Sequence, residues 1–398
     1  MPKRLLIVAD AFPPAFAPRM GNLCKFLDGF DITVVTVDPD LQNWPMDLPQ
    51  NVAVHRFGLA SKFAIVNLFY KFCNYAFSLD DRRLYAKANR ALAGQKFDIV
   101  LCASFYIFPL LCGVKMAKKL QCPLVVDLRD IVEQYAQPVG FQKVTSFFKL
   151  RWLNSWRRNR LLRSADVVTT VSPWHVAELQ KHHAQVRLIY NGFDADDFYF
   201  NAVKSDKFII TYTGRLLEKS DRNPTLFFEA MRTLCKDENF RENVRVRWFV
   251  DADSEKKILP LAQQFGIADC TELNALVSPN EIPDILRASS VVLVLTNKST
   301  ANGPHGVMTT KFFEALGCEK PVLCVPSDED CLADVIRQTN AGVAAASVAE
   351  IEQFILEKYH EWQQFGYTHQ PVNQKEKVRF SRQYQARQFE EIFCNLIS

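Results

Sequence analysis

Short apolar runs that alternate with longer helical patterns are the feature that most constrains this fold. The runs are nearly continuous in apolar residues rather than alternating apolar with polar. Such runs are typical of strands buried on both faces, as in a parallel sheet covered by helices. The pattern therefore predicts doubly wound βαβ folding, with helices such as 84–93 and 108–120 between the strands. The strands predicted in the first half are Arg4–Ala9, Ile32–Val37, Val52–Arg56, Ile99–Ala103, Leu124–Asp127, Val167–Val171 and Val186–Tyr190.

The same pattern restarts after residue 200, which predicts a second domain of the same class. The segment 191–197 separates the two series; it contains glycine and aspartates but no apolar period, as expected of a linker. The tail 381–397 has the apolar spacing of a helix. We place the domains at 1–195 and 196–378, with a C-terminal helix at 379–398. The elements predicted in the second half are strands Phe208–Thr211, Arg245–Asp251, Val291–Leu295 and Pro321–Val325 and helices Pro224–Leu234, Pro279–Ala288 and Thr310–Leu316.

Composition excludes several other classes of protein. The 398 residues suffice for two domains with full cores, and a net charge of +4 is too small to indicate general nucleic-acid binding. The eleven cysteines form no C-x-x-C pair, which favours buried thiols in a reducing compartment over a zinc site. The apolar start 5–9 is too short for a signal peptide, and no run reaches the ~18 apolar residues of a membrane span. We therefore expect a cytoplasmic protein without a metal.

Polar residues that directly follow predicted strands are the candidates for chemistry, because ligands of parallel sheets bind at the carboxyl ends of the strands. In the first half, Asp127, Arg129 and Asp130 end one strand. They predict a functional cluster, the alternative being an Arg129 salt bridge that braces the loop. The proline-rich loop 10–21 carries Arg19 before a helix; it is either an anion site or a plain connection.

In the second half, two loops carry the residues expected at a phosphate group. Gly214 follows a strand and allows close backbone approach, while Arg215, Lys219 and Arg222 supply positive charge; the alternative is a surface turn with solvated cations. The loop 303–309 precedes a helix that either Thr309 or Thr310 caps. Its backbone N–H groups, the helix dipole and Lys311 would cradle a phosphate. Glu314, one turn later, would accept hydrogen bonds from ribose hydroxyls.

These segments together resemble the GT-B glycosyltransferases of family 4. The resemblance implies two Rossmann-like domains that face a cleft, a C-terminal helix that crosses back to the first domain, and a UDP- or GDP-sugar as co-substrate without another cofactor. It implies hexosyl transfer with retention to a glycan or lipid-linked acceptor in surface polysaccharide biosynthesis. The segments that carry it are 17–21, 123–130, 163–174, 186–194, 211–215 and 303–323.

The resemblance also assigns roles to particular residues. The catalytic residues it implies are Lys311, Arg215 and Asp130, with the two cations stabilising the leaving diphosphate without a metal. The donor-binding residues it implies are Gly214, Arg215, Lys219, Arg222, His305, Gly306, Thr309, Thr310, Lys311 and Glu314. The acceptor-binding residues it implies are Arg19, Gly21, Asp127, Arg129 and Asp130.

Two departures from the family pattern keep other functions open. The family pattern has a first glutamate eight positions before Glu314, where this chain has Gly306. Many relatives also carry a histidine after a mid-domain strand, and the corresponding segment 103–106 has none. His305 is the histidine nearest the donor loop, although a single histidine is more often structural. The alternatives are a sugar-nucleotide epimerase of the same fold and a non-catalytic scaffold.

The segment Phe141–Arg163 combines basic and aromatic residues and contains no acidic residue. Such a helix is typical of a membrane-surface anchor. The alternative is a helix that packs its aromatic residues on the sheet and leaves its cations in solvent. Nucleic-acid binding is disfavoured because no known module motif accompanies the segment.

Overall fold

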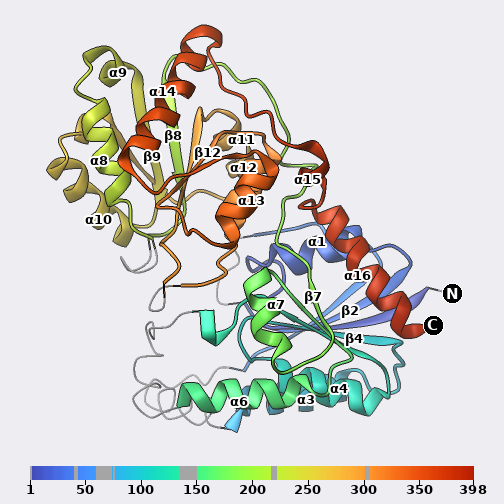
Figure 1. Cartoon of the computed structure of the whole chain (residues 1–398). Coiled ribbons are helices and arrows are strands. Elements are labelled where there is room, and N and C mark those ends of the chain that lie inside the picture. The colour runs from blue at the N-terminus through green and yellow to red at the C-terminus, as the bar shows by residue number, and fades with distance from the viewer. Residues whose placement is uncertain are drawn as a thin grey trace. The chain divides into compact units, whose positions relative to one another are not determined.

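The computed structural model of the chain describes residues 2–39, 44–59, 74, 77–134, 150–216, 222–300 and 304–398. The chain divides into two compact units. The first contains Met1–Tyr190 and Arg382–Ser398, and the second contains Asn191–Ser381. Each unit has its own parallel sheet, so the predicted α/β class with two Rossmann-like halves is confirmed (Figure 1).

The first unit is built on a seven-stranded sheet in the order β3-β2-β1-β4-β5-β6-β7, with every neighbouring pair parallel. This is the strand order of doubly wound folds that bind ligands where the order reverses, here beside β1 and β4. The strands are β1 (Lys3–Ala9), β2 (Phe30–Val37), β3 (Val52–Phe57), β4 (Ile99–Ser104), β5 (Leu124–Leu128), β6 (Val167–Thr170) and β7 (Val186–Leu188).

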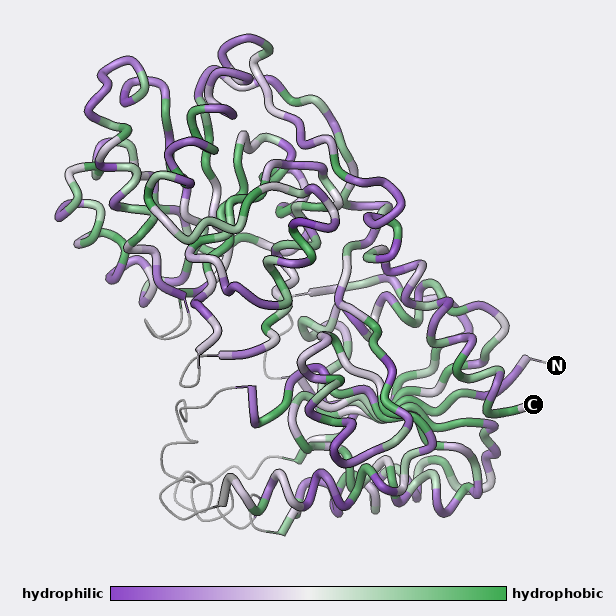
Figure 2. The backbone as a smooth tube through the Cα atoms, viewed as in Figure 1, coloured by the Kyte–Doolittle hydropathy of each residue, from purple (hydrophilic) through white to green (hydrophobic). Residues whose placement is uncertain are grey.

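Helices cover both faces of this sheet and form a separate core on each (Figure 2). One core joins the sheet to α3, α4 and α6, and the other joins it to α1 and α16. Phe30 of β2 and Phe393 of α16 make an edge-to-face contact at 5.8 Å in the second core. The helices are α1 (Pro18–Phe26), α3 (Leu79–Ala91), α4 (Leu110–Leu120), α6 (Leu150–Leu162), α7 (Pro173–Gln180) and α16 (Arg382–Ile397), with a 3₁₀ turn at Val132–Gln134.

The second unit repeats this arrangement with six parallel strands in the order β10-β9-β8-β11-β12-β13. The central strands β8 and β11 are buried along their whole length, as their continuous apolar runs predict. The edge strands β10 and β13 were not predicted. The strands are β8 (Phe208–Thr213), β9 (Val244–Val250), β10 (Thr271–Ala275), β11 (Val291–Leu295), β12 (Val322–Val325) and β13 (Gly342–Ala344).

An aromatic core joins the helices of the second unit to its sheet. Trp248 of β9 is fully buried, and its ring stacks on Phe228 of α8 with 5.7 Å between centroids. Within the described stretches of the chain, no helix is long and apolar enough to cross a membrane. The helices are α8 (Thr225–Leu234), α9 (Glu238–Asn243), α10 (Ala252–Gln264), α11 (Ile282–Arg287), α12 (Thr310–Gly317), α13 (Cys331–Thr339), α14 (Val348–Phe365) and α15 (Gln374–Val378), with 3₁₀ turns at Ala268–Cys270 and Pro279–Glu281.

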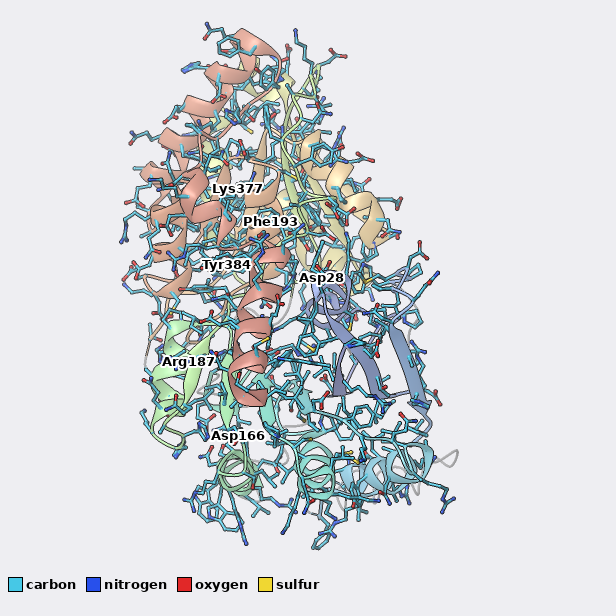
Figure 3. The ribbon with its side chains drawn as sticks, turned by 90° about the vertical axis from the view of Figure 1, so that its right-hand side faces the viewer. Asp28, Asp166, Arg187, Phe193, Lys377 and Tyr384 are labelled. Atoms are coloured by element: carbon cyan, nitrogen blue, oxygen red, sulfur yellow. The ribbon has the colours of Figure 1, made fainter. Side chains whose placement is uncertain are left out.

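The chain passes between the units twice, and the two passages are bonded to each other. The Phe193 N–H donates to the Phe380 carbonyl at 3.0 Å, and Phe193 forms an isolated parallel bridge with Ser381. The Lys377 ammonium lies 5.7 Å from the Phe193 ring centroid (Figure 3). The two passages, near Phe193 and near Ser381, are therefore connected to each other by main-chain pairing.

Candidate functional site

Lys311 lies at the start of α12, against the glycine that ends β8. A Cβ atom at Gly214 would come within 2.6 Å of the Lys311 Nζ and 2.7 Å of its Cε, so no larger residue fits without moving the lysine. Gly214 also has a φ of +105°, which disfavours any side chain. The missing side chain of Gly214 therefore creates the space that the Lys311 ammonium occupies.

The Lys311 side chain is partly buried, and its ammonium has no strong partner among the described residues. Within the described residues it makes no hydrogen bond or salt bridge, and its nearest aromatic contact is the Tyr212 ring at 5.9 Å. Burial and, to a smaller extent, the nearby Arg222 charge together lower the pKa of Lys311 to about 7, against the opposing effect of Glu314. An anion that bound here would form an ion pair with Lys311 and stabilise the charged form of the lysine.

The turn after β8 carries two arginines, Arg215 and Arg222, and is held together by hydrogen bonds to the main-chain carbonyl of Arg215. The Arg215 carbonyl accepts hydrogen bonds from the Tyr212 hydroxyl at 2.9 Å and from Arg222 Nη1 at 2.6 Å. The Arg215 guanidinium is 61% exposed and lies 3.3 Å from the carboxylate of Asp251, the N-cap of α10. Arg222 is thus held close enough to Lys311 for its charge to lower the lysine pKa, whereas the exposed Arg215 has an acidic partner.

The loop that leads into α12 is held by a carboxylate from the next strand end. Asp330 Oδ2 accepts from the Ser299 hydroxyl at 3.1 Å and from the Gly306 N–H at 3.4 Å. Gly306 has a φ of +64°, in the left-handed region. Thr309 is the N-cap of α12, but its side chain makes no capping bond, and Thr310 is the first helical residue. The first N–H groups of a helix have no intrahelical partner, and Thr309 leaves them uncapped.

In the first unit, a charged cluster lies at the carboxyl ends of β1, β4 and β5. Arg129 forms a salt bridge with Asp10, and its guanidinium lies 5.7 Å from the ring of Phe105, which is 42% exposed. Burial raises the pKa of Asp130 to about 7 despite the Arg129 charge. Burial also raises the pKa of Asp10. Two carboxyl groups therefore flank one arginine, and one of them can exchange a proton near neutral pH.

A buried polar chain leads away from Asp130. The Gln134 side chain hydrogen-bonds Asp130, and its Oε1 lies 2.8 Å from His175 Nε2. His175 Nδ1 lies 3.2 Å from the Thr170 hydroxyl. Burial lowers the pKa of His175 to about 4, with the Arg158 charge adding to the effect. His175 is therefore neutral at physiological pH and is fully buried, so it orients Gln134 rather than meeting a ligand.

Two predicted acceptor residues bind each other instead of lining this cluster. Arg19 and Asp127 are 4% and 0% exposed and form two hydrogen bonds of 2.8 Å. Asp127 also accepts from the Thr169 hydroxyl at 2.6 Å, and Arg19 donates to the Tyr190 carbonyl at 2.8 Å. A buried pair with these bonds braces α1 against the sheet and presents no charge to an acceptor. Gly21 is likewise buried in α1, where a Cβ would meet Met46, Trp44 and Pro13.

Two family models match consecutive parts of the chain. The Glycosyltransferase Family 4 model matches residues 21–197, and the model of glycosyl transferases group 1 matches residues 194–359. Together they span residues 21–359, which include most of each unit. The chain belongs to the GT-B glycosyltransferases. No curated protein sequence matches this glycosyltransferase.

Solved structures with the same fold cover almost the whole glycosyltransferase. Sucrose-phosphate synthase from Thermosynechococcus elongatus is 14% identical with a TM-score of 0.69, covering 99% of both chains. Anabaena HepE in complex with UDP and glucose is 16% identical with a TM-score of 0.66, covering 99% of this chain and 100% of its own. A glycosyltransferase from Rickettsia africae is 14% identical with a TM-score of 0.67, covering 100% and 99%. At these identities the likeness shows the fold alone.

The donor-site residues predicted in the glycosyltransferase fall into three groups. Lys311 lies against Gly214, and Arg222 and Glu314 are close enough to affect its pKa, while Arg215 on the same turn pairs with Asp251. Thr309, Thr310, Gly306 and the half-buried His305 lie in or beside the loop before α12. Lys219 lies outside the described residues. No group of three or more metal-ligating side chains occurs within the described part of the chain.

Sequence reasoning missed Asp10, Phe105, Gln134 and Asp330 as site residues. Asp10 directly follows the predicted strand 4–9, and Asp330 ends the acidic run 328–330 after the predicted strand 321–325. The rule that placed Asp130 at a strand end could have found both. Gln134 carried no signal, because its role depends on its contact with the buried ring of His175.

Proposed function

We propose that this glycosyltransferase moves a hexose from a UDP- or GDP-sugar to a hydroxyl of a glycan or lipid-linked acceptor, with retention and without a bound metal. The reaction would serve surface polysaccharide biosynthesis on the cytoplasmic side of a membrane. The single observation that carries the proposal is the partly buried Lys311 ammonium, whose pKa is lowered by burial and by the Arg222 charge at the uncapped start of α12. Two cations and a helix N-terminus are suited to a diphosphate.

The donor diphosphate would neutralise the positive charges of Lys311 and Arg222, which repel each other without a ligand. Lys311 and Arg222 would contact its oxygens, with the α12 N–H groups as additional donors. Glu314 would accept hydrogen bonds from ribose hydroxyls, and the base would lie near the exposed Leu276 that follows β10. Because Arg215 is exposed and paired with Asp251, it would reach the diphosphate only by exchanging that partner.

Departure of the nucleoside diphosphate is the step that the donor site would assist. Negative charge grows on the leaving phosphate as the bond to the sugar breaks, and a preformed cationic site stabilises that charge more than it stabilises the bound donor. In the first unit, Asp130 and Arg129 would hold the acceptor hydroxyl, Asp130 serving as a hydrogen-bond acceptor with a pKa of about 7. Arg19, Gly21 and Asp127 would support that cluster through packing rather than contact.

A contact of the basic aromatic segment 141–163 with a membrane surface is part of the proposal, because a lipid-linked acceptor resides there. Residues 141–149 lie outside the described residues. The remainder forms α6, which begins at Leu150.

Incubation of the protein with UDP- and GDP-hexoses and a panel of acceptors tests the proposed function. We expect a thermal shift with one nucleotide series, and release of the nucleoside diphosphate together with a glycosylated product whose anomeric configuration matches the donor. Conversion of the donor sugar to its epimer without transfer would instead identify an epimerase. No thermal shift with any nucleotide sugar would support a scaffold and overturn the proposal.

Donor affinity is expected to fall as pH rises above neutrality. The diphosphate binds the charged form of Lys311, whose pKa is about 7 without ligand. Above this pH the lysine must first gain a proton, so affinity should fall by up to about tenfold per pH unit between roughly pH 7 and 9. Calorimetry in buffers of different ionisation enthalpy should also show proton uptake on binding. A Lys311→Met variant should show neither effect, and a flat profile in the wild type would contradict the assignment.

A further inference from the structure

Three helices, α3, α4 and α6, lie side by side on one face of the first sheet (Figure 1). They are strongly basic. Lysine and arginine occur four times in α3, three times in α4 and four times in α6, against two acidic residues that are both in α3. The opposite face of the sheet is covered by α1 and α16. One of these arginines, Arg158, is 1% exposed and paired with Glu133 outside the three helices, and the remaining lysines and arginines leave the layer with an excess of positive charge.

Much of this charge is not neutralised by the layer itself. Lys87 donates to the Gly58 carbonyl at 2.7 Å, Arg82 to the Phe77 carbonyl at 3.2 Å, and Lys119 to the Asn89 side chain, all uncharged partners. One of the two acidic residues, Asp81, is 3% exposed and accepts from a main-chain N–H inside the core.

Cations of neighbouring helices in this layer also repel one another. Burial and the positive charge of Arg82 on α3 lower the pKa of Arg157 on α6, against a smaller opposing effect of Asp81. Bringing an anionic surface to the layer would relieve this repulsion.

Large aromatic side chains project from the same layer into solvent. Trp152 is 69% exposed, Trp156 is 47% exposed, and Phe77 at the start of α3 is 58% exposed. Trp152 and Trp156 are four positions apart and so lie on one face of α6. The Arg160 guanidinium lies 5.6 Å from the Trp156 ring centroid. Exposed tryptophans flanked by arginine are typical of helices that rest at the headgroup level of a bilayer.

A surface pocket of about 550 Å³ opens beside these tryptophans. It is lined by Trp156, Asn159, Arg160, Arg163 and His182. Two guanidinium groups, an imidazole and an amide provide donors for phosphate oxygens, and the indole provides an apolar wall. The lining contains no carboxylate, so the pocket suits an anionic group that carries an apolar chain.

We propose that the layer formed by α3, α4 and α6 docks on an anionic phospholipid bilayer and that the pocket takes a lipid phosphate. This inference rests on the membrane contact in the proposed function and extends it from one segment to a three-helix face with a defined headgroup site. Trp152 and Trp156 would enter the headgroup region, while Arg160 and Arg163 bind phosphate. A bilayer fits better than a nucleic acid because the face is a broad helical layer, whereas single strands are bound in grooves.

Co-sedimentation of the full chain with vesicles tests this inference. We expect binding to vesicles of equal parts phosphatidylcholine and phosphatidylglycerol, weakening with added salt, and no binding to phosphatidylcholine alone.

An R160Q/R163Q variant should bind anionic vesicles about 30-fold more weakly, the effect of two surface cations at ~1 kcal/mol each. A W152A/W156A variant should also lose binding. The matched control is K256Q/R337Q, which removes two cations that are 76% and 77% exposed on the second unit and should bind normally.

Donor binding, read as a thermal shift with the nucleotide sugar, separates this inference from the proposed function. We expect all three variants to keep the donor shift of the wild type. Absence of vesicle binding with an intact donor shift would overturn the bilayer inference alone. Equal binding to neutral and anionic vesicles would also overturn it, as would tighter binding to single-stranded RNA than to anionic vesicles at the same salt concentration.

Discussion

Replacing Lys311 by alanine is expected to lower kcat/KM for sugar transfer by about 10²–10³-fold, the usual cost of removing one group that stabilises charge in the transition state. The ammonium is held against Gly214 and beside Arg222, where a diphosphate would be its first strong partner. Its loss removes charge stabilisation on the leaving phosphate as well as donor affinity. We therefore expect kcat to fall and the KM for the donor to rise.

Steady-state kinetics with saturating acceptor, and donor titration by calorimetry, measure the two effects. Lys256→Ala is the matched control, since Lys256 is 76% exposed on α10 and should be silent. A Lys311→Ala protein that binds the donor as tightly as the wild type would remove Lys311 from the donor site.

A stability measurement separates this loss of function from misfolding. The pKa of Lys311 is about 7 in the folded chain and ~10.4 when unfolded, so burial of its charge destabilises the fold fully below about pH 7 and ceases to do so above about pH 10. Lys311→Met keeps the length of the side chain and removes the charge. We expect it to raise Tm most at or below neutral pH and least at about pH 10, while transfer is lost throughout.

Replacing Arg19 by methionine is expected to destabilise the first unit by about 3–5 kcal/mol. The change leaves the Asp127 carboxylate 0% exposed with its two guanidinium bonds lost and only the Thr169 hydroxyl remaining. It also removes the donor to the Tyr190 carbonyl and the contact with Phe389 of α16 at 5.4 Å. The cost is large because an unpaired carboxylate would remain in an apolar interior.

Thermal denaturation followed by tryptophan fluorescence and circular dichroism measures this effect, which should appear as a Tm lowered by roughly 10 °C for a unit of this size. Arg187→Met, an exposed arginine on β7, is the control and should change stability little. An R19M/D127L double variant should recover part of the loss, because it removes the stranded charge. If Arg19→Met instead weakened acceptor binding at unchanged stability, the direct acceptor role would stand and the bracing role would fail.

The buried central strands were predictable because their chemistry is local. A strand covered on both faces must be apolar at every position, so the runs that became β1, β8 and β11 are visible without any partner. The edge strand β10 is half exposed, and its Glu272 pairs with Arg247 of β9 at 2.7 Å. Its polar composition therefore gave no strand signal. The three-residue β13 was too short to show one.

The contact between Gly214 and Lys311 in the proposed donor site could be expected from the sequence for the same reason. Gly214, Lys311 and Glu314 lie at strand and helix ends, and the linear order of strand, loop and helix dictates where such ends meet in a parallel sheet. The carboxylate of Asp330 that accepts from Gly306 was missed, although it lies in the acidic run that follows β12; its contact with Gly306 joins residues 24 positions apart.

Sequence alone determined the fold class, the repeated sheet and the placement of Lys311 at the start of a helix that follows a glycine-containing loop, since each depends on residues close together in the chain. Only the tertiary structure decided which charges are buried against each other and which lie at the strand ends. Arg19 and Asp127 are 108 positions apart, and their mutual burial cannot be inferred from the local pattern around either one. Arg129 and Asp130 carry the same types of charge, yet they lie with Asp10 at the strand ends. Burial and pairing depend on how the chain packs, so only the structure distinguishes the buried Arg19–Asp127 pair from the charges at the strand ends.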